Sequence, residues 1–308
     1  MTRRVIDRTH PEWPGLLDDF VTDKPVRRLF VEGAPLPPGR RAVAVVGSRR
    51  PTNAGIEAAV GITRGLSEAG FSIVSGLAVG IDAVAHKTAL DCDGHTTAVL
   101  GCGHDVDYPR FNSHLRRRID AAGTTVSEYD LGVQPQKAHF PERNRIIAGL
   151  SNAVVFVEGG IRSGGLSTAR HAFDAGRDVF AVPGSLRNPL AAGPNELIRT
   201  SQARLVTDVE HILQELAPGL VWGDDASSAP PAGDPQVNES EARVLLYLED
   251  SATPPDRLCM DLDLTWGEAA FALAAMEARG YVDKRAAGYV LTGAGARVRA
   301  RLPVFEED

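Results

Sequence analysis

The sequence predicts an α/β protein with one large domain, built on a doubly wound, mostly parallel sheet, and a small C-terminal domain. Two observations predict the large domain. From residue 41 onward, short continuous apolar runs alternate with helix-like stretches, which is typical of βαβ units whose strands are buried on both faces. Each of these runs also ends in a glycine. A third observation, a change of composition after Leu216, separates the small domain from the large one.

The apolar runs give the order of the elements. We expect strands at Ala42–Gly47, Phe71–Gly76, Thr96–Gly101, Asn152–Gly160 and Arg177–Gly184. We expect helices at residues 54–69, about 82–90 and 169–176. Residues 1–40 are rich in proline and are expected to form an irregular lead-in that ends in a short apolar piece, Leu29–Val31. Ligands bind at the carboxyl ends of the strands in open α/β sheets, so the loops after these strands should form the site.

Composition and charge exclude several classes of protein. The chain has 308 residues, of which 43% are hydrophobic and 24% charged, as in ordinary globular proteins. Its net charge is −7, so a polyanion would have to bind to a local basic patch. The apolar runs are far shorter than the roughly 20 residues that span a bilayer, and the N-terminus lacks the apolar core of a signal peptide. The few, widely spaced cysteines suggest reduced thiols, so we expect a cytoplasmic protein that does not insert into a membrane.

A second domain is expected at residues 238–303, after a linker at 217–237 that is rich in Pro, Gly, Ser and Asp and before a short tail at 304–308. Asn238 or Ser240 should cap its first helix. Helices at about 254–262 and 265–279, and then two short strands, complete the outline of a winged helix. Ten acidic and only five basic residues lie between Glu239 and Leu291. We therefore expect this domain to contact a protein rather than the major groove of DNA.

The first two loops of the large domain favour different kinds of site. In VVGSRRPTNAG, Gly47 ends the strand and Ser48 and Arg49 lead into the next helix, so backbone N–H groups, a hydroxyl and a guanidinium lie together, as an anion site requires. The alternative is an ordinary turn with a solvated arginine. In the second loop, Asp82 and His86 lie one helical turn apart. This spacing fits an acid–base pair or metal ligands, although a carboxylate in a first turn favours a structural role.

The fourth loop, PQKAHFPERNR, gathers cations at the start of a helix. We expect that helix to begin near Pro141 or Glu142, which places Arg143 and Arg145 in its first turn. Cations there oppose the helix dipole, so a bound anion is the expected partner; the alternative is pairing with carboxylates elsewhere in the fold. Phe140 offers a ring on which a base could stack. The candidate binding residues of this loop are Lys137, Phe140, Arg143, Asn144 and Arg145.

Two further loops lie at the same edge of the predicted sheet. The third, GCGHDVDYPRFN, has no catalytic spacing, and the run Arg116–Arg118 after it is expected to be a solvated face or the extension of a basic track. The fifth, EGGIRSGGLSTARHA, places glycines and small hydroxyl residues ahead of a helix, which is typical of a backbone cradle for phosphate. Its candidate residues are Gly160, Ser163, Gly164 and Gly165.

Taken together, the loops are rich in hydrogen-bond donors and poor in paired acids and bases. The sequence contains no HExxH or GxxxxGK[ST] motif and no recognisable Ser/His/Asp set. We therefore expect no catalytic residue, no cofactor and no metal ion. Several arginines beside an apolar ring fit single-stranded nucleic acid best.

Seven motifs occur in the order and spacing of one family. They are GSRRPTNAG, SGLAVGIDAVAH, GCGHDVDYPRFN, SEYDLG, FPERNRIIAGLS, EGGIRSGG-LSTA and GRDVFAVPGS. In these motifs, and over nearly all of the range from Glu12 to Leu216, the chain resembles the DprA/Smf family, the DNA-processing proteins of bacterial natural transformation. The resemblance implies an extended Rossmann-like fold over residues 41–216 that binds single-stranded DNA, forms a homodimer and loads the recombinase RecA. It also implies that the protein is not an enzyme.

The resemblance assigns roles to individual residues. It implies that Arg49, Lys137, Arg143 and Arg145 contact phosphates and that Phe140 contributes to a pocket that holds a base. The same edge would be lined by Gly47, Ser48, Gly160, Ser163, Gly164 and Gly165.

The resemblance also has two departures. The family's dimer contact resembles residues 193–205, but RTSQARLV stands here where a Gly-Ala pair commonly precedes the last strand. Because about 40 residues precede the first strand expected here, we expect the helical N-terminal domain that the family often carries to be missing or reduced.

Two other functions stay open. The loops also resemble those of the lysine-decarboxylase-like phosphoribohydrolases, which cleave nucleoside monophosphates. That family carries PGGxGTxxE with a catalytic Glu, whereas the helix here carries Arg170 and His171. Release of base from AMP or GMP would identify such an enzyme. A nucleotide-sensing or purely structural module is the third interpretation, which failure to bind any oligonucleotide would favour.

Overall fold

The computed structural model describes residues 3–36, 41–216, 237–248, 252–262, 264–285, 288–292, 295 and 298–299. The chain divides into two compact units, Met1–Val221 and Trp222–Asp308. The linker expected at 217–237 lies outside the described residues except for its last residue, as does the tail at 304–308. The domain boundaries therefore stay a prediction.

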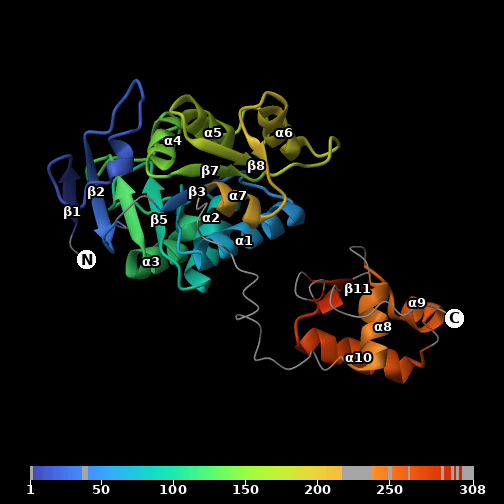
Figure 1. The fold of residues 1–308 in the computed structure, drawn as a ribbon. Helices are drawn as coiled ribbons and strands as arrows, with labels where there is room; N and C mark the ends of the chain where they lie inside the picture. The colour runs from blue at the N-terminus through green and yellow to red at the C-terminus, as the bar shows by residue number, and fades with distance from the viewer. Residues whose placement is uncertain are drawn as a thin grey trace. The chain divides into compact units, whose positions relative to one another are not determined.

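The first unit is built on a nine-stranded sheet in the order β1-β2-β6-β5-β4-β3-β7-β8-β9 (Figure 1). Strands β3 to β9 pair in parallel, and β1 and β2 add an antiparallel edge. The order reverses at β3, because β4 lies on one side of it and β7 on the other, and such a reversal opens a crevice at the strand ends. The strands are β1 Arg4–Asp7, β2 Arg28–Gly33, β3 Ala42–Val46, β4 Ser72–Ser75, β5 Thr96–Leu100, β6 Thr124–Ser127, β7 Ala153–Phe156, β8 Asp178–Ala181 and β9 Arg204–Leu205.

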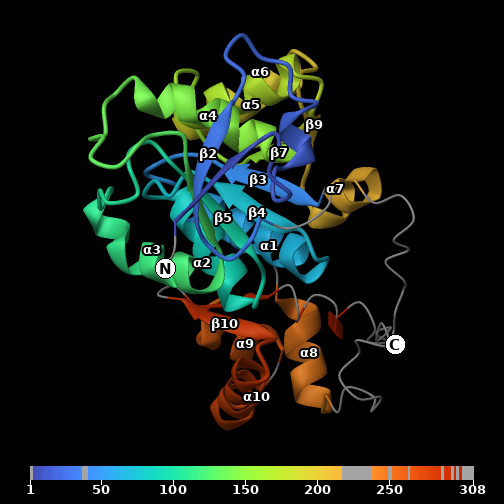
Figure 2. The ribbon, with the colours of Figure 1, turned by 90° about the vertical axis from the view of Figure 1, so that its left-hand side faces the viewer.

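Helices cover both faces of this sheet, which confirms the doubly wound α/β prediction. Figure 1 shows α4, α5 and α6 on one face and α1, α2, α3 and α7 on the other, and Figure 2 shows the same layers from the side. The helices are α1 Asn53–Glu68, α2 Ile81–Asp91, α3 Ser113–Ala122, α4 His139–Gly149, α5 Gly164–Asp174, α6 Ala192–Arg199 and α7 Val209–Leu216. Three short 3₁₀ turns add η1 Gly15–Leu17, η2 Arg110–Asn112 and η3 Pro189–Ala191.

Successive side chains of the buried strands point alternately toward the helices on the two faces of the sheet. In β3, Ala44 and Val46 pack with α4 and α5, whereas Val43 and Val45 pack with α1 and α2. This alternation explains why the strands are continuous apolar runs in the sequence.

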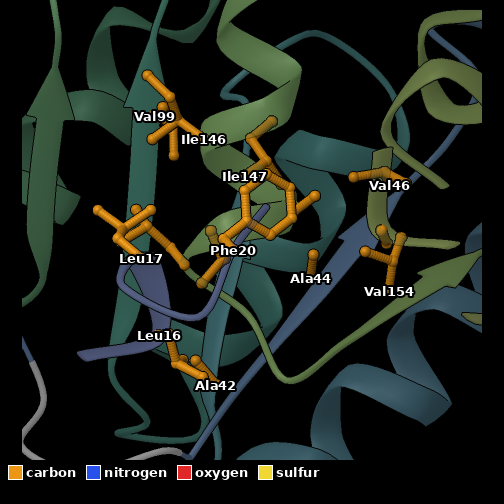
Figure 3. Close-up of a cluster of buried hydrophobic side chains, with 14 of the residues drawn as sticks. Leu16, Leu17, Phe20, Ala42, Ala44, Val46, Val99, Ile146, Ile147 and Val154 are labelled. Atoms are coloured by element: carbon orange, nitrogen blue, oxygen red, sulfur yellow. The ribbon is translucent and has the colours of Figure 1, made fainter. Parts of the chain in front are cut away.

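The prediction of an irregular lead-in was wrong for much of residues 3–36. Strand β2 pairs antiparallel with β6, and β1 pairs with β2. The turn η1 and the residues after it supply Leu16, Leu17 and Phe20 to the core. Leu17 and Phe20 meet the end of α4, whereas Leu16 lies beside Ala42 (Figure 3). A Cβ atom on Gly149 would lie 2.8 Å from Leu17 Cδ2, so α4 must end in a glycine for this packing. Neither strand contains a proline, but prolines at 11, 14, 25 and 35 flank them, and this composition suggested an irregular segment.

The second unit contains the elements expected of it. They are α8 Glu239–Tyr247, α9 Pro255–Asp261, α10 Trp266–Ala278 and the antiparallel pair β10 Val282–Arg285 and β11 Gly288–Leu291. Asn238 and Thr265 begin α8 and α10 with capping boxes. The assignment of this unit as a winged helix stays a prediction. Helix α10 carries no Lys or Arg and exposes Trp266 and Phe271.

None of the helices that the structure describes is long and apolar enough to cross a membrane.

Three histidines are held neutral inside the first unit. Burial lowers the pKa of His86 to about 3 and the pKa of His95 and of His104 to about 4. Their rings meet hydroxyl or carbonyl oxygens, such as Thr96 Oγ1 at 2.7 Å from His86 Nδ1. In the unfolded chain the same imidazoles take up protons near pH 6.5.

We predict that the free energy of unfolding falls as the pH is lowered from about 6.5 to about 4. In that range the unfolded state binds more protons than the folded state, so protonation favours unfolding. Denaturant titrations at about pH 7.5 and pH 5 measure the change. His104→Gln should reduce it, whereas the matched variant of an exposed histidine, His114→Gln, should not. An equal loss of unfolding free energy between about pH 7.5 and pH 5 in wild type and in His104→Gln would contradict the assignment of His104 as a buried, neutral histidine.

Candidate functional site

Two adjoining cavities lie at the carboxyl ends of the central strands, where the strand order reverses. The larger, which we call the polar cavity, has a volume of about 300 Å³ and is walled by the glycine-rich loops that follow β3 and β7. The smaller, which we call the aromatic cavity, has a volume of about 80 Å³ and lies beyond β4 and β5. The residues that line both cavities are Arg49, Ala78, Phe140 and Arg143.

The structure brings most of the predicted site residues to these cavities. The polar cavity is lined by Gly47, Ser48, Arg49, Phe140, Arg143, Asn144, Gly160, Ser163, Gly164 and Gly165. Lys137 and Arg145 line neither cavity. Lys137 is exposed just ahead of α4.

Arg49 and Phe140 together separate the two cavities. The Arg49 guanidinium carbon lies 5.6 Å from the centroid of the Phe140 ring, which is within the range of a cation–π interaction. Arg49 is otherwise exposed. On the side of the aromatic cavity, the Phe140 ring lies 5.5 Å from the ring of Tyr108. A cation and two rings therefore meet at one point of the surface.

Arg143 lies beneath both cavities as a buried cation. Its side chain is 4% exposed, and Nη1 donates hydrogen bonds to the carbonyl oxygens of Gly76, at 2.6 Å, and of Val99. It thereby joins the ends of β4 and β5. A Cβ atom on Gly76 would lie 2.6 Å from this guanidinium, so glycine at this position lets Arg143 keep its place. Burial lowers the pKa of Arg143, while the charge of Asp82 raises it.

Asp82 and His86 form hydrogen bonds with the backbone of the loop between β4 and α2. The Asp82 carboxylate accepts hydrogen bonds from the N–H groups of Gly76 and Ala78, at 3.2 and 3.3 Å. Burial raises the pKa of this carboxyl, and the charge of Arg143 lowers it. His86 Nε2 accepts a hydrogen bond from the N–H of Leu77. These contacts favour the structural interpretation of the pair over an acid–base or metal site.

The observed start of α4 differs from the prediction that Arg143 and Arg145 lie in its first turn. The helix begins at His139, not near Pro141, so Arg143 and Arg145 lie in its second turn rather than its first. Arg145 is also buried, and its Nη2 donates to the Glu128 carboxylate at 2.5 Å. Pairing with a carboxylate elsewhere in the fold, the alternative in the sequence analysis, therefore describes Arg145.

The loop after β7 leaves backbone N–H groups at the polar cavity. Ser163 caps α5 by accepting a hydrogen bond from Leu166 N, and the N–H groups of Gly164 and Gly165 come first in the helix, where they have no partner within it. A Cβ atom on Gly165 would lie 2.6 Å from the Phe156 ring. The glycine at this position lets the loop approach β3 closely, which brings its donors to the cavity.

The carboxylates near the site are already engaged. Glu158 accepts hydrogen bonds from the Thr52 N–H and hydroxyl, at 2.9 and 2.7 Å, and from Asn188 Nδ2 at 3.0 Å. Asp82 is the only carboxylate among the described residues that line either cavity. The site is therefore electropositive, although the chain as a whole is acidic.

Sequence reasoning missed the wall of the aromatic cavity. That wall is formed by Leu100, Tyr108 and Pro109. The third loop showed no catalytic spacing, and the signal that could have found the cavity was its Tyr-Pro pair beside the strand end.

Comparison with known proteins identifies relatives over most of the chain. The family described as DNA recombination-mediator protein A matches residues 4–217. Protein Smf of Escherichia coli is 39% identical over 282 residues, which cover 90% of this chain and 74% of the relative. The DNA processing protein DprA of Streptococcus pneumoniae is 47% identical over 173 residues, which cover 56% of this chain and 61% of the relative.

Two solved structures resemble the first unit. The X-ray structure of DNA processing protein A from Streptococcus pneumoniae matches with a TM-score of 0.65 and 41% identity, over 69% of this chain and 74% of the other. DNA processing protein A from Helicobacter pylori, described for its single-stranded DNA binding mode, matches with a TM-score of 0.63 and 28% identity, over 70% of this chain and 96% of the other.

We predict that Arg145→Met lowers the free energy of unfolding by about 1.5–3 kcal/mol, since it leaves the Glu128 carboxylate without its charged donor. Chemical denaturation measures the loss. In the double variant Arg145→Met/Glu128→Gln, the loss should be smaller than the sum of the two single losses. Strictly additive losses would contradict the ion pair.

Proposed function

Because this chain belongs to the DNA recombination-mediator protein A family, we propose that it is a non-enzymatic protein that binds single-stranded DNA at the two cavities. The observation that carries the proposal is Arg49 lying over Phe140, between a cavity rich in N–H and hydroxyl groups and a cavity walled by aromatic rings. Unpaired nucleic acid offers the two matching groups, phosphates and exposed bases.

The polar cavity suits the phosphate. The N–H groups of Gly164 and Gly165 lie at the positive end of the α5 dipole, and the Ser48 hydroxyl and Arg49 face them across the crevice between β3 and β7. Arg143 contributes its charge from below without leaving the carbonyl oxygens of Gly76 and Val99. In this proposal Arg49 is the direct phosphate ligand, and Arg143 positions the loops and supplies positive potential.

The aromatic cavity suits the base. Phe140 and Tyr108 offer ring faces, and stacking of a base on an aromatic side chain is worth about 1–3 kcal/mol and tolerates any base. Lys137, exposed ahead of α4, contacts the backbone of a longer strand.

A binding protein is supported over a nucleotide-cleaving enzyme. General acid–base catalysis needs a carboxylate or imidazole that is free to exchange protons. Asp82 and Glu158 instead accept hydrogen bonds from the loops they order. The Arg170 and His171 positions lie on α5, where the phosphoribohydrolases carry their catalytic Glu.

We extend the proposal to protein partners. The family description as a recombination mediator supports RecA as the recombinase that this protein serves. A homodimer through residues 193–205 is supported by β9, which is the last strand of the sheet and leaves its outer edge unpaired by any described strand. Leu205 on this strand is 49% exposed, and an exposed strand edge is a template for pairing with another chain.

We predict that Arg49→Ala weakens binding to a dT oligonucleotide by about tenfold or more, because it removes a charge-assisted contact to phosphate. The plot of log affinity against log salt should also become shallower by about 0.7. Fluorescence anisotropy at two salt concentrations measures both quantities.

Arg50→Ala is the matched control for this experiment. It removes the same charge one residue further along the chain, at a position that lines neither cavity. Equal losses for Arg49→Ala and Arg50→Ala, or none for either, would overturn the assignment of the site.

A further inference from the structure

A bulky aromatic side chain is held out in solvent beside the aromatic cavity. Phe111, the middle residue of η2, is 87% exposed. It lies three residues after Tyr108, whose ring lines the cavity and contacts Phe140. Three residues of chain span at most about 11 Å, so Phe111 is close to the cavity mouth.

The exposure of Phe111 is imposed by the fold around it. The next residue, Asn112, is buried, and its Nδ2 donates to the carbonyl oxygen of Leu77 at 2.9 Å. The Ser113 hydroxyl shares its proton between the carbonyl oxygen of Arg110, at 2.6 Å, and the Asp107 carboxylate. Arg116, which is 7% exposed, donates to the carbonyl oxygens of Val106 and His104 at 2.8 and 2.5 Å. A loop fixed on both sides of Phe111 presents this ring in a defined position.

Basic side chains lie near this ring on the same turn and helix. The turn η2 runs directly into α3, and Arg110, His114 and Arg117 follow at intervals of four and three residues, which places them on the same side. All three are exposed. The arginines beside them are engaged elsewhere, because Arg116 is buried and Arg118 pairs with Asp91 at 2.8 Å.

The carboxylates near this face accept hydrogen bonds from neighbouring parts of the fold. Asp107 accepts a hydrogen bond from the Ser113 hydroxyl, and Asp105 accepts one from the N–H of Gly132. Asp120, further along α3, accepts a hydrogen bond from Thr125 Oγ1. Arg110 and Arg117 form no ion pair with any described residue, and two exposed arginines near an exposed ring favour nucleic acid as the occupant over an apolar protein segment.

We propose that residues Arg110, Phe111, His114 and Arg117, which we call the η2–α3 stripe, form a second contact segment for single-stranded DNA outside the cavities. The strand leaves the aromatic cavity past Tyr108, a base stacks on Phe111, and Arg110 and Arg117 contact the phosphates that follow. This proposal rests on the proposed function and adds the direction in which the bound strand continues.

The experiment compares two lengths of dT oligonucleotide, one of about 2 nucleotides that fills only the cavities and one of about 20 that also reaches the stripe. Phe111→Ala should weaken binding of the longer oligonucleotide about fivefold or more and leave the shorter one unchanged. Phe111→Trp should retain the affinity, and Phe173→Ala, an exposed phenylalanine on α5, should have no effect at either length. An unchanged melting temperature shows that the fold is intact.

The outcomes separate the two proposals. Equal losses at both lengths, or no loss at either, would overturn the stripe, whereas the cavities keep their role as long as Arg49→Ala weakens binding at both lengths. Loss of affinity for a protein partner with no change for DNA would assign the stripe to a protein. Binding at both lengths that survives Arg49→Ala would contradict the proposed function itself.

Discussion

The hydrogen bonds from the buried Arg143 guanidinium to the carbonyl oxygens of Gly76 and Val99 hold the site together. They join Gly76, which directly follows β4, to Val99 near the end of the neighbouring parallel strand β5. The same cation packs directly against Gly76 and places a positive charge at both cavities. Arg49 and Phe140 then lie above a floor that is already electropositive and rigid.

Sheet topology explains why this site lies where it does. The strand order reverses beside β3, so the loops after β3 and β7 diverge and leave a crevice that helices do not fill. Gly47 and Gly165 let these loops pack closely, and the N-terminus of α5 faces the crevice. A protein with a net charge of −7 can attract a polyanion there because its cations and N–H dipoles converge while the nearby acids are bound internally.

The parts of this arrangement that depend on local pattern could be predicted from the sequence. Apolar runs ending in glycine located β3, β4, β5, β7 and β8, and the anion-binding loops followed from the α/β rule for strand ends. The parts that depend on tertiary packing could not. Strand β2 needs β6 as a partner, and neither shows an isolated strand pattern. Arg145 looked equivalent to Arg143 in sequence, but two residues along a helix turn a side chain by about 200°, which carries it to Glu128.

A solved structure of the protein with a short dT oligonucleotide tests the central claim most directly. We expect a phosphate within hydrogen-bonding distance of Arg49 and of the N–H groups at the start of α5. A base should lie against Phe140, and Arg143 should still be bonded to the carbonyl oxygens of Gly76 and Val99. An oligonucleotide bound away from the strand ends, or an Arg143 that leaves those oxygens to reach the DNA, would contradict the account.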